Sequence, residues 1–204
     1  MIKLKKGEWF LIFFNLIYIL SFALYYISIR NYEFLWYVAI IIFFFILIIA
    51  TFKKSKFDYI ILWGLTIWGF LHMAGGGLII NGAVLYKLQL IHLCDIGDTY
   101  VLKFDQFVHA FGFAVTTLVA WHLIKPYLNK KVNYKIIYPL LFFIATGAGA
   151  LNEIAEFVAV VVFEKTGVGG YYNTALDLVF NAIGSILAII FIHIRRMKIK
   201  SALS

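Results

Sequence analysis

Residues 35–52 read LWYVAIIIFFFILIIATF, an apolar stretch without a charged side chain. An α-helix rises about 1.5 Å per residue, so about 20 residues cross roughly 30 Å of hydrocarbon. Barrel strands would instead alternate apolar and polar residues over about ten positions. We therefore predict an all-α integral membrane protein with six transmembrane helices, at residues 9–29, 35–52, 59–80, 104–124, 136–163 and 174–194.

The composition of the whole chain supports this class. Of 204 residues, 64% are hydrophobic and 14% are charged, against about 45–50% and about 25% in soluble proteins. These values exclude a soluble domain, and the many aromatic residues exclude a disordered chain. The only cysteine, Cys94, excludes an intrachain disulfide and a cysteine-based zinc site.

The positive charges predict the orientation, because loops rich in Lys and Arg stay on the cytoplasmic side of a membrane. Four cations flank the predicted helices on one side: Arg30, Lys87, Lys103 and Lys165. Fourteen flank them on the other: Lys3, Lys5, Lys6, Lys53, Lys54, Lys56, Lys125, Lys130, Lys131, Lys135, Arg195, Arg196, Lys198 and Lys200. We predict a multi-pass protein of the prokaryotic cell membrane with both termini cytoplasmic. Topology thus explains the net charge of +8 without nucleic-acid binding.

We predict a single membrane domain over residues 1–204. Residues 1–58 would form two scaffold helices, and residues 59–204 a four-helix core that carries the polar residues. The connection at 81–103 begins with Asn81-Gly82, which suits a two-residue turn between short apolar runs. It predicts a small extracellular hairpin or a re-entrant segment between helices three and four, with a plain surface loop as the alternative.

Ionisable side chains inside the predicted helices are the candidate functional residues, because each costs a few kcal/mol to place in a bilayer. The alternating direction of helices three to six brings these residues to the outer third of the membrane. Asp105 and His109 are four residues apart, and Glu153 and Glu156 are three apart, so each pair shares a helix face. The candidate pocket residues of these four helices are His72, Asp105, Gln106, His109, Asn152, Glu153, Glu156, Thr174, Asp177 and Asn181.

Small residues would allow the helices to close around this pocket. Gly147, Gly149 and Ala150 lie on predicted helix five, and Gly184 lies on helix six, one turn after Asn181. We expect a larger side chain at position 184 to separate helices five and six.

The balance of charge leads to a metal hypothesis. The predicted cores of helices three to six hold four acids and no Lys or Arg. Protonation, a cationic histidine or a bound cation would each compensate the acids. Two histidines with carboxylates suit Zn²⁺ or Mn²⁺, and fewer histidine ligands suit Mg²⁺. We predict metal ligands at His72, Asp105, His109 and Glu156, catalytic carboxylates at Glu153 and Asp177, and further pocket residues at Gln106, Asn152 and Asn181.

Three segments resemble a known family: residues 104–109 (FDQFVH), 152–157 (NEIAEF) and 177–184 (DLVFNAIG). They are similar to the YjdF-like family of uncharacterised prokaryotic inner-membrane proteins and, more distantly, to the VanZ-like proteins associated with teicoplanin resistance. The resemblance implies Asp-x-x-x-His, Glu-x-x-Glu and Asp-x-x-x-Asn-x-x-Gly on successive helices. The arginine that VanZ-like proteins tend to carry between the last two helices is absent from residues 167–173.

Three functions fit these residues. The first is a metal-dependent hydrolase or transferase acting on a lipid or lipid-linked substrate from the outer leaflet, with Glu153 as general base. The second is a proton- or cation-coupled transporter, and the third is a non-catalytic membrane protein whose polar groups bond between helices. The inner halves of helices three to six offer only Thr116, Thr117, Thr146 and His122, which favours a closed site over a pathway.

The topology can be tested with single cysteines on a background that lacks Cys94. An impermeant thiol reagent applied to intact cells should label Leu90→Cys and should not label Lys130→Cys. The reverse pattern would disprove the orientation.

Overall fold

The computed structural model describes residues 4–97, 99–129, 131–164 and 166–202. Within them, six helices are long and apolar enough to cross a membrane, which confirms the predicted class. Lys3, Lys130 and Lys165, which were part of the charge distribution, lie outside the described residues. The helices are α1 (Lys6–Ser28), α2 (Tyr32–Ser55), α3 (Tyr59–Gly77), α4 (Phe104–Ile124), α5 (Tyr134–Val162) and α6 (Tyr171–Ala202).

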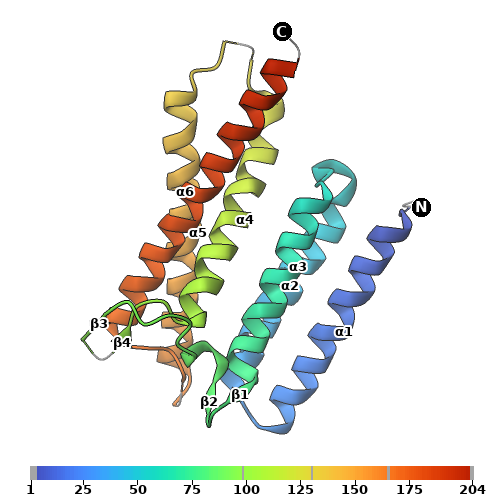
Figure 1. Cartoon of the computed structure of the whole chain (residues 1–204). Coiled ribbons are helices and arrows are strands. Elements are labelled where there is room, and N and C mark those ends of the chain that lie inside the picture. The colour runs from blue at the N-terminus through green and yellow to red at the C-terminus, as the bar shows by residue number, and fades with distance from the viewer. Residues whose placement is uncertain (1–3, 98, 130, 165, 203–204) are drawn as a thin grey trace.

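The helices form two groups, α1–α3 and α4–α6, which meet where α3 contacts α4 (Figure 1). Both chain ends lie at one end of the bundle, and the short strands lie at the other (Figure 1). We call these the basic end and the hairpin end. The basic end is the one that the charge distribution assigns to the cytoplasm.

Side-chain caps determine where several helices begin. Asn31 accepts a hydrogen bond from the backbone N–H of Phe34, so α2 begins at Tyr32, three residues before the predicted start. Asp58 accepts in the same way from Ile61 at the start of α3. Such caps satisfy N–H groups that have no partner within the helix. As a result, Glu33 belongs to α2, where it is buried.

The predicted hairpin between helices three and four is confirmed, and it shortens α3. The prediction of helix up to residue 80 was wrong, because α3 ends at Gly77. The next residues form β1 (Ile79–Ile80), which pairs antiparallel with β2 (Ala83–Val84). Asn81 and Gly82 have φ of 52° and 79°, the left-handed pair that a two-residue hairpin turn requires.

The rest of the connection holds further short elements. These are the 3-10 turn η1 (Leu85–Lys87) and a second antiparallel pair, β3 (Asp95–Ile96) with β4 (Thr99–Tyr100). The connection between α3 and α4 therefore folds back over the hairpin end of the bundle. At the opposite, basic end, a second 3-10 turn, η2 (Lys125–Tyr127), follows α4.

The closest helix contact lies between α4 and α6. A Cβ at Gly184 would lie 1.9 Å from the carbonyl oxygen of Ala110, so only glycine allows this approach. The expectation that a larger side chain at position 184 would separate helices five and six was therefore wrong in its partner, because the bare face of Gly184 meets α4. Gly149 of α5 does pack on α6, against the carboxamide of Asn181. Gly147 was also expected at an interface, but its added Cβ would have no neighbour within 4 Å.

A matched pair of glycine substitutions tests this contact. Gly184→Ala should lower the melting temperature in detergent, because overpacking costs about 1–3 kcal/mol and the clash here is with backbone. Gly147→Ala should leave the melting temperature unchanged or raise it, because alanine favours a helix by roughly 0.5–1 kcal/mol over glycine. Equal melting temperatures for both variants would contradict the contact.

Candidate metal centre

The start of α4 determines the position of Asp105 and His109. Gln106 Oε1 accepts a hydrogen bond from the backbone N–H of Lys103 at 3.1 Å and from that of Leu102 at 2.5 Å. These bonds satisfy N–H groups at the helix start. Gln106, predicted as a pocket residue, is thus engaged in capping, and the next turn carries His109 toward the interior.

His109 lies between carboxylates of two helices. Its Nδ1 is 3.0 Å from Asn181 Oδ1. A carboxamide oxygen only accepts, so Nδ1 is the donor of this contact, and in a singly protonated ring Nε2 carries the lone pair. Nε2 is 3.8 Å from Asp105 Oδ1, and Nδ1 is 3.8 Å from Glu153 Oε1.

Two sets of side chains are arranged so that they could hold a metal ion. The first is Asp105, His109 and Asp177, and the second is His109, Glu153 and Glu156. In each set, one ligand atom per residue lies within 4.8 Å of the others. His109 belongs to both. The structure thus brings together five of the six residues predicted as metal ligands or catalytic carboxylates, from α4, α5 and α6. We call these five residues the acid–histidine cluster.

His72 takes a different position from the other predicted ligands. Its Nδ1 is 2.5 Å from the hydroxyl oxygen of Tyr86 in η1. Its ring packs edge-on against Tyr37 of α2, with centroids 5.4 Å apart. His72 belongs to neither set above, so each set contains one imidazole.

Two residues that the sequence analysis did not assign to the site support the acids. Asn173 Nδ2 donates to Asp177 Oδ2 at 2.6 Å and to Asp105 Oδ2 at 3.4 Å. The Lys103 ammonium is buried, donates to the side-chain oxygen Oδ1 of Asn173, and lies 3.8 Å from Asp105 Oδ2. Asn173 precedes Asp177 by four residues, as Asp177 precedes Asn181, and this spacing could have identified it.

Helix α2 also reaches this region. Glu33 accepts a hydrogen bond from the backbone N–H of Gly167 at 2.6 Å, which ties α2 to the connection between α5 and α6. Tyr37 of α2 also packs against the His72 ring. The segment predicted as scaffold is therefore tied to the connection between α5 and α6 and to α3.

Several buried polar atoms of this region lack hydrogen-bond partners among the described residues. They are both carboxylate oxygens of Glu153, Oδ1 of Asp177, Nδ2 of Asn181 and the hydroxyl of Tyr37. An unsatisfied buried polar group costs about 1–3 kcal/mol, and more if it is charged. Three of the five atoms are carboxylate oxygens, which are ligands for divalent cations. The unsatisfied atoms therefore fit a bound cation.

The charge of the acid–histidine cluster also favours a bound cation. Four carboxylates face one imidazole and one lysine, Lys103, so the set has a formal charge of −3 with the acids ionised and the imidazole neutral. A divalent cation would reduce it to −1. In a medium of low dielectric constant, this reduction is a large electrostatic gain.

The fold and the cluster define a polytopic membrane protein with a buried His/carboxylate group near its hairpin end. The chain belongs to the family described as "Predicted membrane protein (DUF2238)", whose model matches residues 10–198. No curated protein and no solved structure matches the chain.

The role of Asn173 can be tested by comparison with its neighbour. Asn173→Leu keeps the size of the side chain and removes its hydrogen bonds to Asp105, Asp177 and Lys103, so we expect a loss of about 1–3 kcal/mol of stability. The matched control, Thr174→Val, should change stability by less than about 0.5 kcal/mol. Thermal unfolding in detergent measures both, and a control that melts as low as Asn173→Leu would contradict the network.

Proposed function

We propose that this protein is a membrane enzyme in which Asp105, His109 and Asp177 hold a divalent metal ion. Its reaction is hydrolysis or group transfer on a lipid or lipid-linked substrate that enters from the outer leaflet. The observation that carries the proposal is the convergence of unsatisfied carboxylate oxygens on one oriented histidine. Glu153 is then the general base, and Glu156, whose Oε1 accepts from Asn152 at 3.0 Å, lies beside it.

The orientation of His109 supports this assignment. Metal-binding histidines commonly donate their second N–H to a carbonyl or carboxylate, which fixes the tautomer and directs the lone pair at the ion. The bond from His109 to Asn181 has this form. It leaves Nε2 facing Asp105, on the side of the first ligand set.

The ligand types favour a hard cation. Carboxylate oxygens suit Mg²⁺ and Mn²⁺, whereas Zn²⁺ sites with protein oxygen ligands usually contain more than one histidine. With one imidazole in each set, Mn²⁺ is the best match, ahead of Mg²⁺ and Zn²⁺. Such an ion supplies Lewis-acid stabilisation of a developing oxyanion.

Glu153 is suited to accept a proton. Both of its oxygens are buried and free of hydrogen bonds among the described residues, and Oε1 is 3.8 Å from His109. A general base must reach a proton within about 3 Å, directly or through one water. Glu153 can do so on the α5 side of His109, while Asp105 and Asp177 remain on the other side.

The packing below the cluster supports a closed site rather than a transport pathway. The buried hydrogen bond between Thr117 and Ser185 is the next polar contact along α4 and α6. Toward the basic end follows an apolar cluster of Ala120, Ile137, Leu141 and Ile192. An ion or proton moving inward would have to cross this buried apolar layer.

The resemblance to known families and the location in the cell membrane are part of the same proposal. The motifs on α4, α5 and α6 resemble those of YjdF-like and VanZ-like proteins, and each of the three motifs contributes residues to the cluster. A location in the cell membrane, with the cluster on the outer side, rests on the distribution of Lys and Arg.

Metal binding by paired histidine variants tests the proposal. Purified protein should bind about one Mn²⁺ and melt at a higher temperature in its presence. His109→Gln keeps a polar side chain of similar size and should lower the affinity for Mn²⁺ by at least about 10–100-fold. His193→Gln, which changes an exposed histidine at the basic end, should bind as the parent does.

His72→Gln tests whether His72 is a ligand, because it was predicted as one and lies outside both sets. Retained Mn²⁺ binding in this variant would exclude His72 as a ligand and leave the sets that contain His109. A parent protein that binds no divalent ion, by elemental analysis and by thermal shift with Mn²⁺, Mg²⁺ and Zn²⁺, would refute the proposal.

A further inference from the structure

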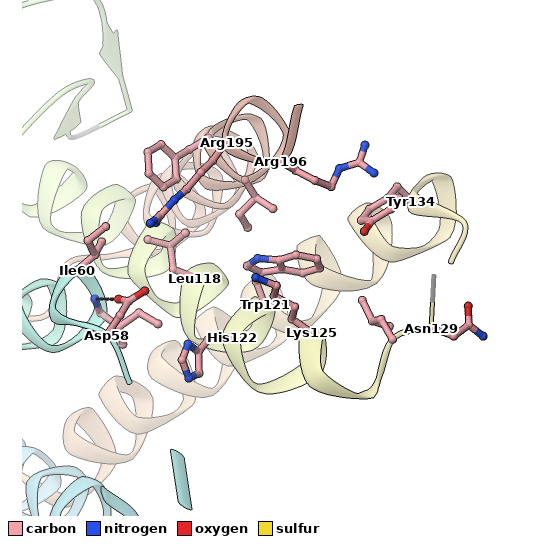
Figure 2. A pocket seen from close by; sticks show the side chains of 14 residues that line it. Asp58, Ile60, Leu118, Trp121, His122, Lys125, Asn129, Tyr134, Arg195 and Arg196 are labelled. Carbon is pink, nitrogen blue, oxygen red and sulfur yellow. Dashed lines mark hydrogen bonds between the residues drawn. The ribbon is translucent and has the colours of Figure 1, made fainter. Parts of the chain in front are cut away.

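A cavity at the basic end lies far from the acid–histidine cluster. Its volume is about 370 Å³, within the range of small-ligand pockets. It opens between the start of α3, the end of α4, the start of α5 and the end of α6 (Figure 2). We call it the basic-end cavity. The acid–histidine cluster contributes none of its lining.

Three cations line this cavity: Lys125 at the end of α4, and Arg195 and Arg196 on α6. Among the described residues, none of the three forms an ion pair with a carboxylate. The cavity also contains one acid, Asp58, whose Oδ1 already accepts the backbone N–H of Ile61. The lining is therefore cationic and has unused capacity for an anion.

The contacts of Arg196 indicate that its guanidinium is held in position before a ligand binds. Its guanidinium carbon lies 3.5 Å from the centre of the Tyr134 ring, a cation–π contact that holds the group in place. Its Nε is buried and has no hydrogen-bond partner among the described residues. Arginine N–H groups match the oxygens of a phosphate better than any other side chain does. Arg196 therefore lines the cavity with hydrogen-bonding capacity that no described residue uses.

The remaining lining is apolar and aromatic. Ile60, Leu118 and Phe191 line the cavity beside Trp121, whose ring stands between Arg195 and Tyr134 in Figure 2. Ile60 and Phe191 are also exposed on the outside of the bundle, where acyl chains run. A soluble anion makes no use of such a surface, whereas a lipid covers it and places its phosphate among the cations.

We propose that the basic-end cavity binds the phosphate headgroup of an anionic phospholipid from the inner leaflet. The depth agrees with this occupant, because the cavity lies at the ends of four membrane-spanning helices on the side assigned to the cytoplasm. Basic pockets between helices on that side suit anionic lipid headgroups. The bound lipid links α3, α4, α5 and α6, so its occupancy stabilises the bundle.

Thermal unfolding with defined additives tests the proposal. Detergent-solubilised protein is mixed with phosphatidylglycerol, with phosphatidylcholine, or with inorganic phosphate. Phosphatidylglycerol should raise the melting temperature at concentrations at which the other two do not. An equal shift in melting temperature with phosphatidylcholine would show that the site does not distinguish an anionic lipid from a zwitterionic one. An equal shift with inorganic phosphate would assign the site to a soluble anion. Either result overturns the proposal.

Charge variants locate the effect. One cation near an anionic lipid contributes an affinity factor of about five, so Arg195→Gln with Arg196→Gln should weaken phosphatidylglycerol binding by about 25-fold or more. Lys198→Gln is the control, because it removes one charge from the same helix end outside the cavity, and it should bind within about twofold of the parent. An equal loss of affinity in the double arginine variant and in Lys198→Gln would show that general surface charge causes the effect. That result would contradict the proposed site.

Exposed Lys125 provides a second variant in case the double arginine variant does not fold. Lys125→Gln is a mild surface change and should weaken phosphatidylglycerol binding about fivefold. An unchanged affinity for Lys125→Gln would contradict the proposed position of the headgroup. His109→Gln should keep the parent's response to lipid, which separates this site from the metal centre.

Discussion

The backbone contact between Gly184 and Ala110 determines the geometry of the candidate site. Helices in a bilayer gain little from hydrophobic burial against each other, so close packing and hydrogen bonds hold them together. At this contact, α6 approaches α4 without an intervening side chain. The approach lets Asn181 reach the His109 ring and places Asp177 in the same ligand set as Asp105. The sharing of His109 with Glu153 and Glu156 then follows from the packing of Gly149 on Asn181.

The carboxylates impose a second requirement, because their charge has to be balanced away from water. Part of that balance comes from outside the membrane-spanning segments. Lys103 is the last residue before α4 and is nevertheless buried beside Asp105. It also donates to Asn173, which bonds Asp105 and Asp177. The connection at the hairpin end is thus part of the site as well as a link between helices.

The sequence predicted the helices well because the bilayer restricts what can span it. A stretch of 18 or more apolar residues in lipid has to be a helix, so hydropathy alone located all six. The end of α3 was missed because Leu78, Ile79 and Ile80 are as apolar as the helix before them. Apolar residues suit an interfacial hairpin as well as a helix, and only the backbone conformation distinguishes them.

The candidate site was predicted in part for a similar reason. The rise per residue gives the height of each side chain in the membrane, and this placed Asp105, His109, Glu153, Glu156 and Asp177 at one level. The rotation of each helix depends on packing, which one sequence does not reveal. His72 is engaged by Tyr86 rather than by the two ligand sets. Asn173 was overlooked because the predicted span began one residue after it, and Lys103 because its charge was read as a topology marker.

The bond from His109 to Asn181 joins residues that are 72 positions apart, and this separation affects how the protein is made. Ribosomes add about 5–20 residues per second, so α4 waits roughly 4–14 s before Asn181 exists. During that time Asp105 and His109 must be stabilised by something other than α6. Their location near the start of α4 leaves them close to the hydrated headgroup region, where water can solvate them. The same residues at the middle of the bilayer would have no such solvent during synthesis.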